Sequence, residues 1–520
     1  MTVRPSVDQH RALLSALYEA AVQGAAPFER TRDAVSAWCA EHDITSGTRV
    51  HVLALGKAAP AMLQGAVAAL DARGLRPAGG VLVSHALPEH FVAPPTLRVA
   101  LGDHPVPGPG SLAAAESIEE AIWDVSADDV ALVLLSGGTT ALCAAPIPAL
   151  SQAAGDAAAA QALVANLAQT LLEGGLAIHE MNAIRRRVLR FGAGRLATAL
   201  HQRGARRIAT FAISDVIGDD EAVIGSGPCT PDPFDDATFL AVLDAHDLRS
   251  RLQREMSTVL GLAGSGTPPV VPSPAHPAFG ITSYRIVARN ALAVAEASRA
   301  ASQRGVSTVV TDDTPLEGDA ALLGEVLAQR ALALARQTPH GSTAVLLAGG
   351  EPVVDLHATM ARAVQFGEDD DARLDADDAM ARAEGFARPR RPSAADDPLK
   401  GGRMQGLALS AALALESAAM RGQTDAWRVR VLAAGTDGRD GPTDAAGAIT
   451  DAATPGLTRR HGRAPETDLA TGRSYLSLDA ADVKPPPAAD DPSTPPWAGA
   501  AAYPTGAPRP TTRGGVGGRG

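Results

Sequence analysis

Short apolar runs alternate with longer amphipathic stretches along the first half of the chain. The apolar runs span residues 49–55, 80–84, 130–136 and 208–214. Strand-length apolar runs separated by helical stretches predict parallel strands joined by crossover helices, and therefore an α/β layered domain. A first helix is predicted from residue 9 to about residue 40, because Leu13, Leu14 and Leu17 recur at helical spacing.

The same pattern returns after a proline-rich segment, Gly266 to Pro277. Proline stiffens a chain and prevents regular structure, so we assign residues 266–282 to a linker. Residues 1–265 then form the first domain, and residues 283–455 form a second, smaller α/β domain. Its strand and helix candidates lie at residues 283–287, 291–303, 307–311, 318–337, 342–348 and 428–433.

Two stretches lack the periodicity of packed elements. Residues 357–399 are polar and acidic, which is typical of a solvated insertion; a cation site is the alternative. From Lys484 onward the chain consists mainly of Pro, Gly, Ala, Thr and Arg, and we assign residues 456–520 to a divergent, largely disordered tail.

Composition and charge exclude several classes of partner. The chain has 46 Lys+Arg against 58 Asp+Glu, a net charge of −12, which repels nucleic acid and anionic membranes. No stretch stays apolar for about 18 residues, and the first ten residues do not read as a leader, so we expect a cytoplasmic protein without a membrane span. The cysteines, Cys39, Cys143 and Cys229, lie too far apart to predict a disulfide framework or a zinc site.

Lysine is scarce in this chain, which draws attention to Lys57. Only three of the 46 basic residues are lysine, the other two being Lys400 and Lys484. Lys57 follows an apolar run and Gly56, at the carboxyl end of a predicted strand, where open α/β sheets bind their ligands. Its ammonium could neutralise a phosphoryl group during transfer.

A glycine-rich loop, Ser136-Gly-Gly-Thr-Thr140, follows the strand predicted at residues 130–136. Glycines let main-chain N–H groups approach an oxyanion, and a helix start adds partial positive charge. The loop therefore indicates a phosphate or carboxylate cradle, with a tight strand-to-helix turn as the alternative.

Carboxylates follow the strand predicted at residues 208–214. Asp215 and Asp219 could hold Mg²⁺ or accept a hydroxyl proton, since magnesium binds one or two carboxylates together with phosphates and water. The alternative is that Asp215 caps the next segment.

Glycine-rich polar loops also occur in the second domain. They are Ala348–Glu351, Lys400–Gln405 and Ala434–Ala448. Arg403 in the second loop could donate two parallel hydrogen bonds to a carboxylate or phosphate. The third loop contains Asp437 and fits a turn, an anion nest or a cation site.

In this order, the loops resemble those of the glycerate 2-kinase family with a MOFRL C-terminal domain, some of whose members are labelled hydroxypyruvate reductase. The resemblance covers roughly residues 9–455. The most specific motifs are Leu135–Leu142, Met181–Arg187, Ser214–Asp220, Gly225–Pro228 and Gly435–Gly447. The resemblance implies a Rossmann-like N-terminal domain and an active site in the cleft between two domains. It also implies ATP-dependent phosphorylation of D-glycerate at the 2-hydroxyl, with a divalent cation.

The resemblance also implies roles for individual residues. Lys57 and Arg403 would be the catalytic cations, and Asp215 a metal ligand or base, with Asp219 as a second metal ligand. Arg185 and Arg186 would hold the substrate carboxylate, although arginines on a helix are more often surface groups. The nucleotide and its phosphates would contact Ser136, Gly137, Gly138, Thr139, Thr140 and Asp437.

The chain departs from the family pattern in ways that keep two alternatives open. Gly192-Ala-Gly-Arg195 lacks an expected lysine, and Met404 and Gly406 replace the usual Asn and Glu. These losses support a non-catalytic relative that binds nucleotide or glycerate. A hydroxypyruvate reductase ranks last, because no dinucleotide-binding glycine motif opens a βαβ unit. The usual closing segment of the family is absent, which suggests a reading-frame change near the end, and a homodimer is left open.

Overall fold

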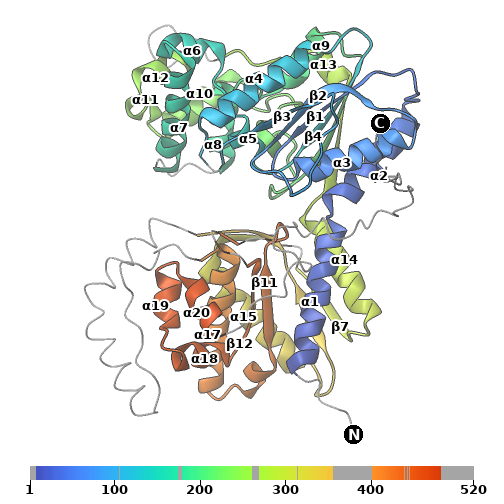
Figure 1. The fold of residues 1–520 in the computed structure, drawn as a ribbon. Coiled ribbons are helices and arrows are strands. Elements are labelled where there is room, and N and C mark those ends of the chain that lie inside the picture. Colours follow the sequence, from blue (N-terminus) through green and yellow to red (C-terminus); the bar gives the residue numbers. More distant parts are fainter. Residues whose placement is uncertain are drawn as a thin grey trace, which may run out of the picture.

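The computed structural model describes residues 7–104, 106–173, 178–260, 269–312, 314–354, 401–438, 440–441, 443 and 445–481. They form two lobes, one above the other in Figure 1, and residues of both line a common cleft. Within these ranges we find no helix whose length and apolar content would let it traverse a lipid bilayer.

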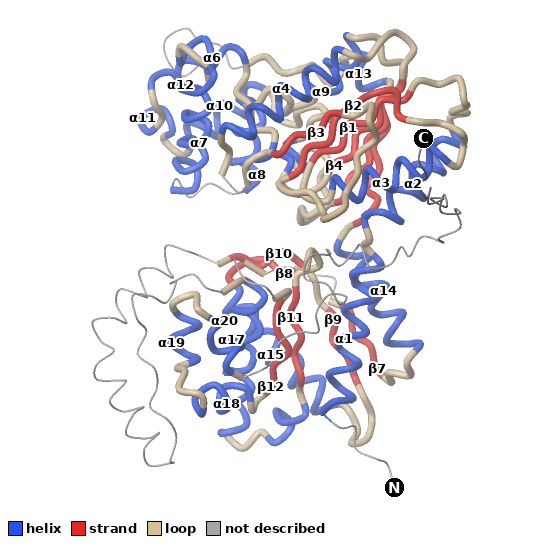
Figure 2. The backbone as a smooth tube through the Cα atoms, viewed as in Figure 1, coloured by secondary structure: helices blue, strands red, loops and turns tan. Residues whose placement is uncertain are grey.

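A six-stranded parallel sheet forms the centre of the first lobe (Figure 2). Its strands, in spatial order, are β3 (Arg98–Leu101), β2 (Pro77–Ser84), β1 (Val50–Leu55), β4 (Val130–Leu135), β5 (Arg207–Ile213) and β6 (Thr282–Ala288). This order is that of doubly wound nucleotide-binding folds. The expected Rossmann-like α/β architecture is therefore confirmed.

Helices cover both faces of the sheet, which explains why its central strands are continuous apolar runs. In β1, Val52 and Ala54 face one core, while Leu53 and Leu55 face the other. The first core is closed by α2 (Pro27–Glu41) and α3 (Ala59–Asp71), and the second by α4 (Pro109–Trp123), α5 (Thr139–Leu142), α9 (Arg195–Gln202), η1 (Ile224–Ser226) and α13 (Pro277–Gly280).

A separate helical group extends from this lobe and has its own apolar core, centred on Leu150, Leu171, Ile184 and Phe239. Its helices are α6 (Pro148–Ala154), α7 (Ala157–Glu173), α8 (Ile178–Val188), α10 (Asp236–Ala245), α11 (Leu248–Arg251) and α12 (Arg254–Val259). This group carries three consecutive arginines, which are described with the site below.

The second lobe contains three two-stranded sheets surrounded by helices. β7 (Thr308–Thr311) pairs with β9 (Ala344–Leu347) and β8 (Leu316–Asp319) with β10 (Gly350–Val353), both parallel, while β11 (Arg430–Ala434) and β12 (Gly447–Asp451) are antiparallel. The helices are α1 (Val7–Gly24), α14 (Asn290–Gln303), α15 (Ala320–Gln337), α17 (Arg403–Met420), η2 (Thr424–Arg428), α18 (Thr454–Arg460), α19 (Pro465–Ala470) and α20 (Ser474–Ala480).

The lobes do not follow the predicted boundaries. Helix α1, the first in the chain, lies beside α14 in the second lobe (Figure 1), where Leu17 packs with Ala300 and Ala301. Residues 282–288, predicted to open the second domain, instead form β6 of the first sheet by pairing with β5. An apolar run or an apolar helix face indicates that a segment is buried, but it does not indicate which lobe buries it. The domain assignments of α1 and of β6 differ from the structure for this reason.

The second lobe also continues past residue 455. Helices α18 to α20 pack on α17, and Arg463 and Arg473 share the buried carboxylate of Asp468. The part of the predicted tail from 456 to 481 is therefore folded. The predicted insertion at 357–399 and residues 482–520 lie outside the described residues.

Candidate active site

The strand order of the first sheet reverses between β1 and β4, so the loops that follow these two strands open a crevice at their carboxyl ends. Two hydrogen bonds connect these loops. The Lys57 N–H donates to the Gly137 carbonyl at 2.9 Å, and the Ala58 N–H donates to Ser136 Oγ at 3.1 Å. Gly56 adopts φ +124°, and a Cβ there would lie 2.2 Å from Ser136 Oγ. Glycine is therefore required for this close approach.

Three side chains surround the Ser136–Gly138 loop. A Cβ on Gly137 would lie 2.3 Å from Asp215 Oδ2, whereas a Cβ on Gly138 would lie 3.2 Å from both Lys57 Cγ and His104 Cδ2. Asp215 therefore lies over one glycine, and Lys57 and His104 lie over the other. The Lys57 side chain is exposed to the cleft.

The two threonines of this loop are used internally. Thr139 Oγ1 is buried and donates to the carbonyls of Leu55 and Ser136, each at 2.8 Å. Thr140 Oγ1 lies 2.9 Å from Ser226 Oγ. These hydroxyls fix the loop, so its ligand-facing surface consists of Ser136 and the glycine main chain.

The carboxylate of Asp215 follows β5 and is open to the cleft. Desolvation by the surrounding walls raises its pKa, and the charges of Lys57 and Arg403 act in the opposite direction. One of these cations comes from each lobe. Lys57, Asp215 and Arg403 line one cleft, to which both lobes contribute.

The second lobe presents Arg403 at the first position of α17. Its guanidinium pairs with Glu351 and donates to the Pro352 carbonyl at 3.3 Å. The α17 start is held by Asp440, which accepts from the main-chain N–H groups of Met404 and Gln405 at 3.0 and 2.7 Å. A carboxylate at a helix N-terminus stabilises that end of the helix, so Arg403 projects from a fixed support.

Residues of both lobes line one cleft of about 2410 Å³. The first lobe contributes Lys57, His85, His104, Ser136, Gly137 and Asp215, and the second contributes Gly349, Gly350, Glu351, Arg403 and Asp437. The arrangement offers cations from both lobes, a glycine-lined loop and one carboxylate around a shared space, which is what positioning and charge neutralisation of an anionic ligand require.

The two predicted metal ligands differ in their surroundings. Asp219 pairs with Arg289 at 3.4 Å, whereas Asp215 has no such ion pair among the residues the structure describes. In those residues, no group of three or more His, Cys, Asp or Glu side chains is arranged as a metal site. A single carboxylate fits Mg²⁺ when nucleotide phosphates and water supply the other ligands. Asp215 fits that role.

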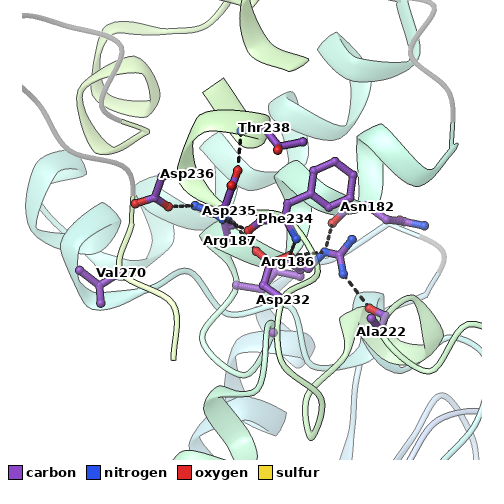
Figure 3. Close-up of polar contacts among 12 residues, drawn as sticks. Asn182, Arg186, Arg187, Ala222, Asp232, Phe234, Asp235, Asp236, Thr238 and Val270 are labelled. Atoms are coloured by element: carbon purple, nitrogen blue, oxygen red, sulfur yellow. Dashed lines mark hydrogen bonds and ion pairs between the residues drawn. The ribbon is translucent and has the colours of Figure 1, made fainter. Parts of the chain in front are cut away.

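The arginines predicted to bind substrate do not line the cleft. Arg186 is buried on α8 and donates to the carbonyls of Asn182 and Ala222 at 3.2 and 3.0 Å (Figure 3). Arg185 is half-buried on the same helix, and burial lowers its pKa. The structure thus brings Lys57, Asp215 and Arg403 together but leaves Arg185 and Arg186 outside the site.

Arg187, beside them, forms a buried structural anchor. It binds Asp232 at 2.9 Å, Asp236 at 2.5 Å and the Phe234 carbonyl at 2.5 Å, and its guanidinium lies 4.4 Å from the Phe239 ring centroid (Figure 3). These contacts hold the α10 start against α8. Packing of the helical group therefore explains Arg186 and Arg187, whereas the buried Arg185 Nε has no hydrogen-bond partner among the described residues.

Arg187→Ala is expected to lower the free energy of unfolding by about 3–5 kcal/mol, because it removes the closer cation of the buried Asp232 carboxylate and leaves only Arg186, at 3.8 Å. The matched control is Arg98→Ala, which also removes contacts to two carboxylates, Glu120 and Asp124, but at the surface. The control should cost about 0.2–1 kcal/mol. Urea unfolding measures both, and equal losses would contradict the anchor.

Two cleft residues, His85 and His104, were missed as site candidates. They follow β2 and β3, and their ring centroids lie 6.5 Å apart. The signal was the one that marked Lys57 and Asp215: a polar side chain directly after a predicted strand or just beyond it.

Two family models match the chain. Residues 13–261 match a domain of unknown function, DUF4147, and residues 395–485 match the MOFRL family. The chain is 33% identical to a glycerate kinase from Macaca fascicularis over 355 aligned residues. The aligned region covers 66% of this chain and 80% of that protein. It is 27% identical over 432 residues to a D-glycerate 2-kinase from Thermotoga maritima, covering 83% and 85% of the two chains.

One further relative and one solved structure are also similar to the chain, the latter in its fold. A relative from Agrobacterium vitis, 30% identical over 76% of this chain and 85% of its own, is named "Putative hydroxypyruvate reductase". The fold matches a crystal structure of a glycerate kinase from Thermotoga maritima with a TM-score of 0.65 and 24% identity, over 92% of this chain and 95% of the other.

Proposed function

The chain belongs to the glycerate kinase family with a MOFRL C-terminal domain, and from that premise we propose that it transfers the γ-phosphoryl group of ATP to the 2-hydroxyl of D-glycerate, giving 2-phospho-D-glycerate. One observation carries the proposal: Lys57 and Arg403, from opposite lobes, line a single cleft together with the carboxylate of Asp215. Phosphoryl transfer depends mainly on positioning and charge neutralisation, and this arrangement can supply both.

Each residue has a role in this proposal. The ammonium of Lys57 neutralises charge on the transferring group beside the Ser136–Gly138 loop, whose glycines allow close main-chain approach. The guanidinium of Arg403 stabilises the same group from the opposite lobe. Asp437, exposed on the cleft wall, faces the nucleotide.

Asp215 is the proposed acidic group. When a magnesium ion is bound with the nucleotide, it neutralises phosphate charge, and Asp215 is the residue that would hold it. The same carboxylate is also placed to accept the hydroxyl proton of the acceptor. The two roles are alternatives. The raised pKa favours proton acceptance, compared with an ordinary aspartate, only when Asp215 holds no cation, because a bound magnesium ion stabilises the ionised carboxylate.

A second candidate function, binding without turnover, is supported by two contacts. Arg190 and Arg195 are the cations next to Gly192 in the sequence, where the family's lysine is missing. Arg190 pairs with Glu119 at 3.0 Å, and Arg195 donates to carbonyls that include those of Arg186 and Val270. Neither side chain lines the cleft within the described residues, so neither replaces the lost charge there.

A product assay separates these functions. The full chain is incubated with MgATP and D-glycerate, and the phosphoglycerate isomer is identified by ³¹P and ¹³C NMR. We expect 2-phosphoglycerate. Formation of 3-phosphoglycerate would correct the position of transfer, and calorimetric binding of ATP or glycerate without product would favour the second candidate. Oxidation of NADH by hydroxypyruvate would instead support a reductase.

A further inference from the structure

His104 stands beside Lys57 in the cleft and has no role in the function proposed above. Its ring lies over Gly138, where a Cβ would be 3.2 Å from His104 Cδ2, 3.4 Å from its Nε2 and 3.2 Å from Lys57 Cγ. The imidazole and the lysine side chain therefore stand on the same side of the Ser136–Gly138 loop. Asp215 lies over the neighbouring glycine, Gly137.

The backbone that carries His104 is held in place by the preceding residue. Asp103 Oδ2 accepts from the N–H groups of Gly110 and Ser111 at 2.7 and 3.2 Å, and the Asp103 N–H donates to Ser111 Oγ at 3.1 Å. Gly102 packs so closely that a Cβ there would lie 2.2 Å from the Leu142 carbonyl oxygen. The main chain of Gly102 and Asp103, which precedes His104, is thus anchored before any ligand binds, and this lowers the ordering cost of binding.

The two groups whose charges lower the pKa of His104, Lys57 and His85, are both basic. Partial burial, then Lys57, then His85 lower its pKa to about 4, so the ring is neutral at pH 7. A neutral imidazole keeps one N–H donor and one acceptor nitrogen. In the described part of the chain this ring makes no hydrogen bond, unlike His51, whose Nε2 lies 3.0 Å from the buried carboxylate of Asp129.

We propose that His104 is a substrate-binding residue that, together with the ammonium of Lys57, binds an oxyanion of the bound substrates. The oxyanion is either the carboxylate of the hydroxy acid or a phosphate oxygen of the nucleotide. Both present the same chemistry to a lysine and an imidazole N–H. The inference rests on the proposed kinase function and adds a ligand to its site.

The separation of charges around the loop supports this assignment. Lys57 and His104 flank Gly138, while the carboxylate of Asp215 lies over Gly137. The loop therefore has a side that attracts an oxyanion and a side that repels one. A hydroxy acid or a nucleotide can bind there with its anionic group away from Asp215.

The test compares His104→Ala with His104→Gln, which retains an N–H donor. Steady-state kinetics with D-glycerate and MgATP varied separately give both KM values, and calorimetry gives the two dissociation constants. His104→Ala should raise KM and the dissociation constant of one substrate about 10- to 100-fold, the effect of losing a hydrogen bond to a charged group. His104→Gln should recover part of this loss.

The substrate that is weakened identifies the oxyanion: glycerate indicates the carboxylate, and ATP indicates the phosphate. The matched control, His90→Asn, changes an exposed histidine that pairs with Glu89 outside the cleft, and it should leave both constants unchanged. Unchanged constants for both substrates in His104→Ala, or equal changes in both, would overturn the proposal.

The product assay with the wild-type protein tests the proposed kinase function independently of the role of His104. If the wild-type protein forms no phosphoglycerate, the kinase assignment fails, and the calorimetric comparison of wild type with His104→Ala still decides whether His104 binds an oxyanion. A wild-type protein that binds neither substrate overturns both proposals.

Discussion

Lys57→Ala should lower kcat for phosphorylation of D-glycerate by at least about 100-fold, because it removes a cation that stabilises the transferring charge. Lys57 is the cation closest to the Ser136–Gly138 loop, to which its own main chain is hydrogen-bonded. Its side chain is exposed to the cleft and makes no structural ion pair among the described residues, so the fold should tolerate its loss. Steady-state kinetics at saturating MgATP and glycerate measure the effect.

The control for Lys57→Ala is Arg299→Ala, which removes an exposed cation paired with Glu296 on α14. Its kcat should stay within about twofold of wild type, since surface ion pairs contribute little. Thermal unfolding of both variants checks that the fold is retained. Near-normal turnover in folded Lys57→Ala would remove Lys57 from the catalytic machinery.

Arg403→Ala should also lower kcat by about 100-fold, since it removes a cation that the second lobe contributes to the cleft. Arg403 is held by Glu351 and the Pro352 carbonyl, and its charge reaches Asp215 on the opposite lobe. Arg403→Lys should recover only a small part of the rate, because an ammonium lacks the planar fork that binds two oxygens of one group.

Arg421→Ala is the matched control for Arg403→Ala. It removes an exposed arginine at the other end of α17, where the side chain contacts only Ser417 among its described hydrogen-bond partners. The kcat of this variant should equal that of wild type. If Arg403→Lys matched wild type as well, the two-pronged contact would be wrong, and a point charge would suffice.

Local pattern was enough to find the strands and the loops that follow them. Lys57, Ser136 and Asp215 were selected because each follows an apolar run, and a run buried on both faces is a strong signal of a central parallel strand. In a parallel sheet these strand ends share one edge, so the residues were expected to lie close together. The structure places them around one crevice.

The same reasoning did not distinguish a ligand-binding arginine from a structural one. Arg185, Arg186 and Arg187 occupy successive positions on one helix, and their spacing carries no record of the neighbour that each one meets. Arg187 is bound by carboxylates brought from the Asp232–Asp236 segment, and Arg186 is bound by main-chain carbonyls. Only the packing of α8 against α10 decides this.

By itself the sequence determined the α/β class, the apolar strands and the chemical groups at their ends, because these depend on burial and periodicity along a few consecutive residues. Only the tertiary structure decided which lobe receives α1 and β6, and whether Arg403 faces Lys57. It also decided that His104 stands beside that lysine. Those outcomes depend on which surfaces pack together, and a local pattern specifies that a face is covered without specifying what covers it.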